Sequence, residues 1–132
     1  MASIFTKIVN GEIPCYKVAE SEIFLAFLDV HPLAKGHTLV IPKKEIDYLF
    51  DIEDELFTGL FLFAKKVSKA IKKAIPCKKV GVAVIGLEVA HAHIHLVPIN
   101  SVGDINFAKQ KLQLTKEELE SIANLIIKEY QN

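Results

Sequence analysis

Three of the five histidines in this chain occupy alternate positions, His91, His93 and His95, in the segment AHAHIHLVP. Alternate residues of a β-strand point to the same face, so a strand over residues 91–97 places all three imidazoles together. The intervening Ala92, Ile94 and Leu96 then face the core. Imidazole titrates near neutral pH, so this surface can supply a nucleophile, a proton donor and hydrogen bonds to an anion.

Three interpretations of this set compete. Buried structural imidazoles would each need a hydrogen-bond partner. A metal site is also compatible with histidine, but the first and third imidazoles of such a strand lie about 13 Å apart at roughly 3.3 Å per residue. One ion would therefore need His37 or a carboxylate such as Glu88 to complete its ligand set. Covalent phosphoryl or nucleotidyl transfer needs no metal, because His93 can attack phosphorus with a histidine on either side.

The composition limits the class of protein. A chain of 132 residues is long enough for one core, and we expect a single domain over residues 1–132. The 16 basic residues balance 16 acidic ones, so no global field favours nucleic acid or a membrane surface. No apolar run is long enough to span a bilayer, and the N-terminal segment lacks the long apolar stretch of a signal peptide. We therefore expect a cytoplasmic protein. Cys15 and Cys77 are expected to be unpaired, and His31, before Pro32, is assigned no role.

The hydrophobic pattern predicts an α+β fold, with an antiparallel meander sheet, a long central helix, and N- and C-terminal helices. Thr115 and Glu118 form a capping box before the last helix. The strand after Pro76 is expected to turn at Gly86. The predicted elements are a short helix at residues 3–9, strands at 15–20, 22–28 and 37–42, a helix at 53–74, a strand at 79–89, the histidine strand at 91–97, and a C-terminal helix after Thr115.

The motif HAHIHLV resembles the signature of the histidine triad (HIT) family, in which His-x-His-x-His is followed by two apolar residues. IFTKIVNGEIP at residues 4–14 resembles the family's N-terminal helix and turn. FLDVHPLAKGHTLVIPKK at residues 27–44 resembles its strand, loop and strand with the additional histidine. The similarity covers most of the chain and implies the α+β fold described above, without a cofactor.

The resemblance implies a role for each histidine. His93 would be the nucleophile that attacks the α-phosphorus, with its tautomer fixed by the backbone carbonyl of His91. His95 would bind the phosphoryl oxygens or help protonate the leaving group. His91 and His37 would orient the nucleophile and relay protons. The nucleotide would be bound by an acid for the ribose hydroxyls, an apolar wall around the base and a carboxylate near the leaving group: Asp29; Phe5, Ile8, Ile13, Phe27 and Val30; and Glu88.

Several positions depart from the family pattern. Gly86, Leu87, Glu88 and Val89 replace the Gly-Gln-Ser-Val of the phosphoramidase branch, which changes the expected leaving-group preference. No asparagine precedes the triad to contact the phosphate, so we expect either a lower affinity for nucleotide or substitution by another donor such as Asn100 or Ser101. Ser3 and Thr6 stand where some bacterial relatives have zinc-binding cysteines, so no structural zinc is expected.

We therefore expect a nucleotide hydrolase or transferase that acts on purine nucleoside phosphoramidates or related nucleotidyl conjugates. The alternatives are a non-catalytic module that binds a nucleotide or a partner, and a metal site built on His91, His93 and a carboxylate. Apolar residues outside the main stripe of the long helix, Phe57, Phe61 and Leu62, predict a homodimer that covers them. The alternative is that the C-terminal helix covers this face.

Overall fold

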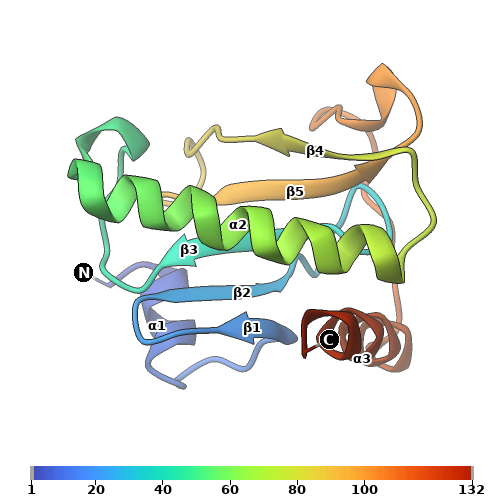
Figure 1. The fold of residues 1–132 in the computed structure, drawn as a ribbon, viewed down its shortest axis with the longest axis horizontal. Helices are drawn as coiled ribbons and strands as arrows, with labels where there is room; N and C mark the ends of the chain where they lie inside the picture. Colours follow the sequence, from blue (N-terminus) through green and yellow to red (C-terminus); the bar gives the residue numbers. More distant parts are fainter. Residues whose placement is uncertain (1, 132) are drawn as a thin grey trace.

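The computed structural model describes residues 2–131, which form a five-stranded antiparallel sheet with helices around it (Figure 1). The strand order in the sheet is β1-β2-β3-β5-β4. The strands are β1 (Lys17–Glu20), β2 (Phe24–Leu28), β3 (Thr38–Pro42), β4 (Lys79–Ala83) and β5 (Ile94–Ile99). The α-helices are α1 (Ile4–Val9), α2 (Asp54–Ala74) and α3 (Lys116–Gln131), and short 3-10 helices occur at Leu49–Asp51 and Val102–Asp104.

This architecture confirms the predicted α+β class. The first three strands form a meander, whereas β5 pairs with β3 and leaves β4 at the edge of the sheet. The Glu53 side chain caps α2 by accepting a hydrogen bond from the backbone N–H of Leu56, and the predicted capping box of Thr115 and Glu118 begins α3. The unpaired state of Cys15 and Cys77 is confirmed as well.

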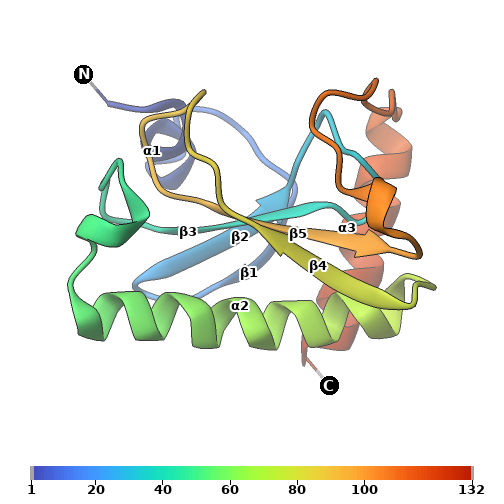
Figure 2. The ribbon, with the colours of Figure 1, turned by 90° about the horizontal axis from the view of Figure 1, so that it is seen from above.

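Alternate side chains of the central strands point to opposite faces of the sheet and pack into two separate cores. All five residues of β2 are buried, because both faces of the sheet are covered. Phe24, Ala26 and Leu28 belong to the larger core, whereas Leu25 and Phe27 belong to a smaller core on the opposite face. Figure 2 shows α2 against one face, with α1 and the loops on the other.

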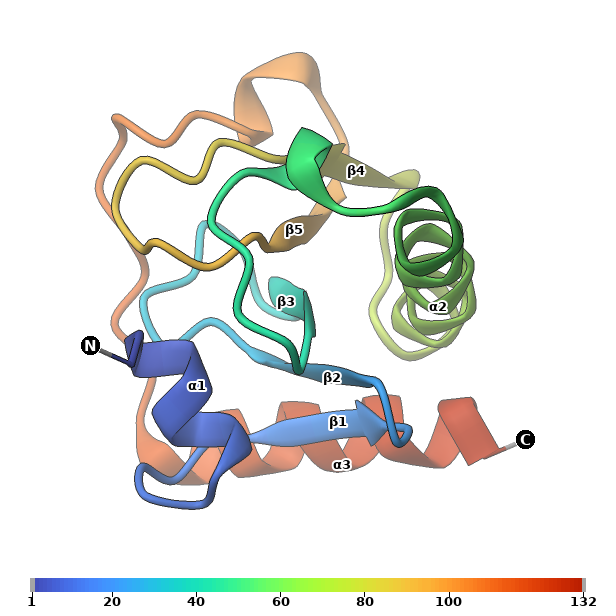
Figure 3. The same cartoon turned by 90° about the vertical axis from the view of Figure 1, so that its left-hand side faces the viewer.

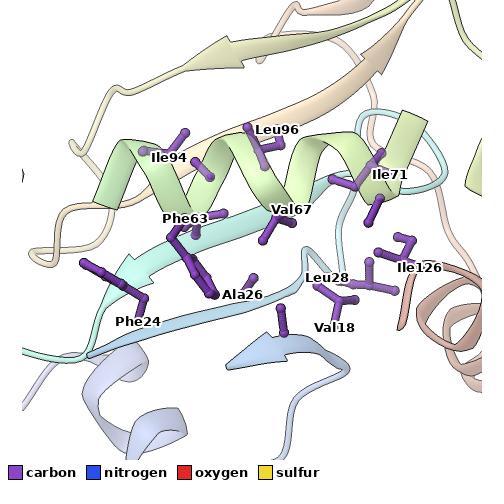
Figure 4. Close-up of a cluster of buried hydrophobic side chains, with 14 of the residues drawn as sticks. Val18, Phe24, Ala26, Leu28, Phe63, Val67, Ile71, Ile94, Leu96 and Ile126 are labelled. Carbon is purple, nitrogen blue, oxygen red and sulfur yellow. The ribbon is translucent and has the colours of Figure 1, made fainter. Parts of the chain in front are cut away.

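The larger core fills the space between the sheet and α2 (Figure 4). Val67 and Ile71 of α2 pack there with Ile94 and Leu96 of β5. Helix α3 lies beside β1, as Figure 3 shows, and it contributes Ile126 to the same core. This packing fixes β5 from behind, so the opposite face of β5 can carry polar side chains.

The connection between β4 and β5 corrects two predictions. The predicted strand at 79–89 ends at Ala83, and the turn at Gly86 uses a positive φ of 73° within a longer loop. The triad strand begins at Ile94 rather than His91, because the N–H of His91 donates to the Val89 carbonyl and the N–H of Ala92 donates to the Ile46 carbonyl. These donors are therefore not available for strand pairing.

Within residues 2–131, every helix is too short or too polar to cross a lipid bilayer.

Candidate active site

A cavity of about 480 Å³ is lined by Phe5, Phe27 and Leu39 of the smaller core, so it lies on the side of the sheet opposite α2. Its volume falls within the usual range for small-molecule sites. Helix α1, strand β2, the loop before β5 and the segment before α3 contribute to its walls. The sequence-predicted residues that line it are His37, His93, His95, Asp29, Phe5, Ile8, Ile13, Phe27, Val30 and Glu88.

His93 is held in one orientation at the cavity wall. Its Nδ1 lies 2.7 Å from the carbonyl oxygen of His91, which can only accept, so Nδ1 carries the proton and donates. This hydrogen bond is the one that the family resemblance implied. The Phe5 ring packs edge-on against the imidazole at a centroid distance of 5.0 Å. The neutral His93 ring therefore has an unprotonated Nε2, the form that a nucleophile requires.

The tautomers of His37 and His95 follow from one backbone group. The N–H of Leu33 donates to Nδ1 of His37 at 3.0 Å, so the proton of His37 is on Nε2. That nitrogen lies 2.9 Å from Nδ1 of His95, which must accept. The proton of His95 is consequently on Nε2. The cavity thus contains one bare imidazole nitrogen on His93 and an N–H donor on His95.

Burial keeps this histidine pair uncharged at neutral pH. Desolvation lowers the pKa of His37 from 6.5 to about 3, with contributions from the nearby His95 and Lys111. Desolvation also lowers the pKa of His95 to about 4, with a contribution from His93. The pair therefore contributes hydrogen bonds to the site rather than positive charge.

His91 lies behind the cavity and does not line it. Its side chain is fully buried, and its Nε2 lies 2.7 Å from the carbonyl oxygen of Pro42, to which it donates. Nδ1 is then an acceptor, and the hydroxyl of Ser3 lies 2.9 Å from it. The structure thus places the His91 main chain against the His93 ring and the His91 side chain against α1.

A small polar network continues from His91 to the surface. The Thr6 hydroxyl donates to Glu45 Oε1 at 2.6 Å, and the backbone N–H of Ser3 donates to the same oxygen at 2.7 Å. Ser3 also caps α1 by accepting from the N–H of Thr6. Hydrogen bonds from Thr6 and Ser3 lower the pKa of Glu45 to about 2. Residues Ser3, Thr6, Glu45 and His91, called here the α1 clamp, bond the first helix to the triad segment.

Asp29 lies beside the histidine pair at the end of β2. Its Oδ1 accepts a hydrogen bond from the N–H of His31 at 2.9 Å, and its Oδ2 is 3.6 Å from Nε2 of His37. Burial raises the pKa of Asp29, although the His31 N–H and nearby positive charges oppose the shift. Asp29 thus offers a carboxylate to the cavity beside the apolar side chains of Phe27 and Val30.

The interpretation of the triad as buried structural imidazoles describes only part of the arrangement, because two of these histidines also line a cavity. All three triad histidines are buried, and no buried side-chain nitrogen or oxygen in residues 2–131 lacks a hydrogen-bond partner. His93 and His95 nevertheless line the cavity. The predicted alternation is confirmed for His93 and His95, whereas His91 does not line the cavity and the regular strand starts only at Ile94.

The possible metal ligands differ from those considered from the sequence. Asp29, His37 and His95 are the described residues that bring ligand atoms within 4.8 Å of one another, and His91 and His93 do not belong to that group. In this group, both nitrogens of His37 are already engaged, with Leu33 and with His95. A metal ion would have to break the hydrogen bond between the two histidines.

The sequence did not indicate several of the residues that line the cavity, and two residues that it suggested for phosphate binding do not line it. Phe107 and Lys111 lie in an irregular segment with no periodic pattern, and His31 lines the cavity although it had been assigned no role. Asn100 and Ser101, expected as phosphate donors, do not line the cavity. Asn100 instead accepts a hydrogen bond from the N–H of Lys78, and Ser101 begins a 3-10 helix.

The fold and the site define a class of small α+β protein in which a histidine triad lies at an apolar cavity. The HIT domain matches residues 10–102. The chain belongs to the HIT domain family.

Individual relatives agree with this assignment. The chain is 40% identical over 99 residues to adenosine 5'-monophosphoramidase hnt1 of Schizosaccharomyces pombe, with 74% of each protein covered. It is similar to the structure of a Hit-like protein from Bartonella henselae, with a TM-score of 0.83, 32% identity, and 96% and 95% of the two chains covered. A Zn-bound histidine triad family protein from Mycobacterium smegmatis gives a TM-score of 0.82 at 27% identity, covering 99% and 94%.

Proposed function

We propose that this chain, as a single HIT-like domain, hydrolyses purine nucleoside phosphoramidates or related nucleotidyl conjugates at the α-phosphorus through a nucleotidyl-histidine intermediate. The similarity to a phosphoramidase supports nucleotide hydrolysis as the general activity. The observation that carries the proposal is the hydrogen bond from His93 Nδ1 to the His91 carbonyl, which leaves Nε2 as the attacking atom beside the cavity.

In the first step, His93 Nε2 forms a bond to the α-phosphorus as the bond from phosphorus to the leaving-group nitrogen breaks. The leaving amine takes up a proton from solvent and departs, and the water that attacks in the second step returns a proton to solvent. In the second step, water attacks phosphorus and breaks the bond to Nε2, which releases the nucleoside monophosphate and restores His93. Covalent catalysis of this kind replaces one difficult displacement with two easier ones.

His95 serves this reaction as a hydrogen-bond donor to the phosphoryl oxygens. Its Nδ1 accepts from His37, so loss of the Nε2 proton would leave an imidazolate. Protonation at Nδ1 would place two protons between the rings, which agrees with the lowered pKa of His95. Between the two roles considered from the sequence, the hydrogen bonds favour stabilisation of developing negative charge over proton donation to the leaving group.

The remaining cavity residues bind the nucleoside in this proposal. Asp29 accepts hydrogen bonds from the ribose hydroxyls, as its place beside Phe27 allows. Phe5 and Ile8 contribute the apolar wall for the purine base. Glu88 lies on the wall formed by the loop before β5, where it faces the leaving group.

A homodimer is the second part of the proposal. Leu62 is 61% exposed on α2, and α3 contacts α2 elsewhere, where Tyr130 packs against Phe63 and Lys66. The aromatic rings of Phe57 and Phe61 are in contact, 5.1 Å apart, and are only partly buried. Since β4 is also an open edge strand, a second copy can cover both the helix and the strand edge.

Incubation with an adenosine 5'-phosphoramidate in the presence of EDTA tests the activity. The proposal predicts release of AMP at a rate that EDTA does not change. AMP binding measured by calorimetry without turnover of any conjugate would instead identify a nucleotide-binding module. Activity that disappears with EDTA and returns with zinc would identify a metal-dependent site.

A further inference from the structure

The segment between the Val102–Asp104 turn and α3 forms one wall of the cavity, although it lies beyond the residues matched by the HIT domain. Figure 2 shows this segment beside the β2–β3 loop. Helix α1 lies on the same face of the sheet, at its other end. The N–H of Leu112 donates to the Pro32 carbonyl at 2.9 Å. The Phe107 ring packs against His95 at a centroid distance of 4.7 Å. The segment is therefore fixed against the third triad histidine.

Lys111 carries an ammonium group on this wall. Two carbonyls of its own segment accept from Nζ, that of Phe107 at 2.5 Å and that of Lys109 at 3.2 Å. An ammonium has three donors, so one remains for a ligand. The ion pairs among residues 2–131 involve Lys17, Lys43, Lys116 and His37, and none involves Lys111.

The charge of Lys111 matters because carboxylates and a neutral histidine pair lie beside it in the cavity. Lys111 is the one lysine among the described lining residues, which contain no arginine, whereas Asp29 and Glu88 supply two carboxylates. His37 and His95 are neutral at pH 7 for the reason given above. Without Lys111, an anionic phosphoryl group would therefore meet the Asp29 and Glu88 carboxylates and the neutral pair of His37 and His95 with no lysine to offset them.

We propose that Lys111 binds the phosphoryl oxygens of the nucleotide and so makes the cavity select phosphorylated nucleosides over free nucleosides. The inference rests on the proposed function, because it takes the cavity to be a nucleotide site. The two carbonyls orient the ammonium, and its third N–H makes a charge-assisted hydrogen bond to the anion.

Calorimetric titration of AMP and of adenosine separates this role from a structural one. Lys111→Met keeps the aliphatic stem and removes the charge. It should weaken AMP binding roughly 10- to 100-fold, as expected for a lost charge-assisted hydrogen bond, while adenosine binding stays the same. Lys109→Met is the matched control, because it keeps the carbonyl that Lys111 contacts and does not line the cavity. It should change neither affinity, and Lys111→Arg should retain AMP binding within a few-fold.

Two results would overturn the assignment of Lys111. Unchanged AMP affinity in Lys111→Met would mean that the ammonium does not contact the phosphoryl group. Equal weakening of AMP and adenosine would mean that Lys111 only supports the wall of the cavity. Failure of the unsubstituted protein to bind either ligand would contradict the proposed nucleotide site itself, and the role of Lys111 with it.

Discussion

His37 and His95 are 58 residues apart in the sequence, yet their rings share a hydrogen bond of 2.9 Å whose direction is set by the backbone N–H of Leu33. Gly36 allows the chain to turn immediately before His37, because its φ of 95° lies in a region that favours glycine. The bond fixes which nitrogen of His95 faces a substrate as a donor.

Protein stability should fall in mild acid because both rings resist protonation when folded. Burial lowers the pKa of His37 to about 3 and that of His95 to about 4, against 6.5 for an unperturbed histidine. Below pH 6.5 the unfolded chain binds more protons, so this contribution is complete above pH 6.5 and is lost as the pH falls toward the folded values. Urea denaturation at pH 7.5 and pH 5 should show a smaller free energy of unfolding at pH 5, and His95→Gln should reduce the difference. Equal free energies at the two pH values would be inconsistent with a buried neutral pair.

The α1 clamp predicts a stability cost for a single hydroxyl. Ser3→Ala removes the cap of α1 and the donor to buried His91, and should lower the free energy of unfolding by about 1–3 kcal/mol. Ser68→Ala is the matched control, because the Ser68 hydroxyl bonds only to a carbonyl on the exposed side of α2. It should change the free energy by less than about 0.5 kcal/mol. Similar values for the two variants would argue against the clamp.

His95→Ala should reduce kcat while leaving AMP affinity less affected. Loss of one donor to a developing oxyanion costs about 10²- to 10³-fold in kcat. Steady-state kinetics on an adenosine phosphoramidate, together with AMP titration of the same variant, separates the two effects. A change confined to KM would assign His95 to ground-state binding.

The exposed surface of α2 predicts a dimer at micromolar concentration. Light scattering should give twice the mass of one chain, and Leu62→Lys should shift the protein toward the monomer because it places charge in the interface. The face of α2 that carries Phe63 is not expected to take part in the dimer, since Tyr130 of the same chain already packs against it. A monomeric mass for the unsubstituted protein would show that the partly exposed phenylalanines of α2 remain at the surface.

The sequence predicted the triad face correctly because one physical requirement governs it. Ile94 and Leu96 must be buried under α2, and this requirement places His93 and His95 on the opposite face. The start of β5 was not predictable from the same pattern, since the N–H of Ala92 finds a distant partner at Ile46. Lys111 was missed for a related reason, because tertiary contacts alone bring its irregular segment to the cavity.

A search for the proposed covalent intermediate on His93 tests the mechanism most directly. The unsubstituted protein, mixed with excess adenosine phosphoramidate and quenched rapidly in alkali, should contain one adenylyl group per chain, assigned by mass spectrometry to the His93 side chain. His93→Ala should show no adduct and lose activity by orders of magnitude while remaining folded. An adduct on another residue, or rapid turnover by His93→Ala, would contradict the proposed mechanism.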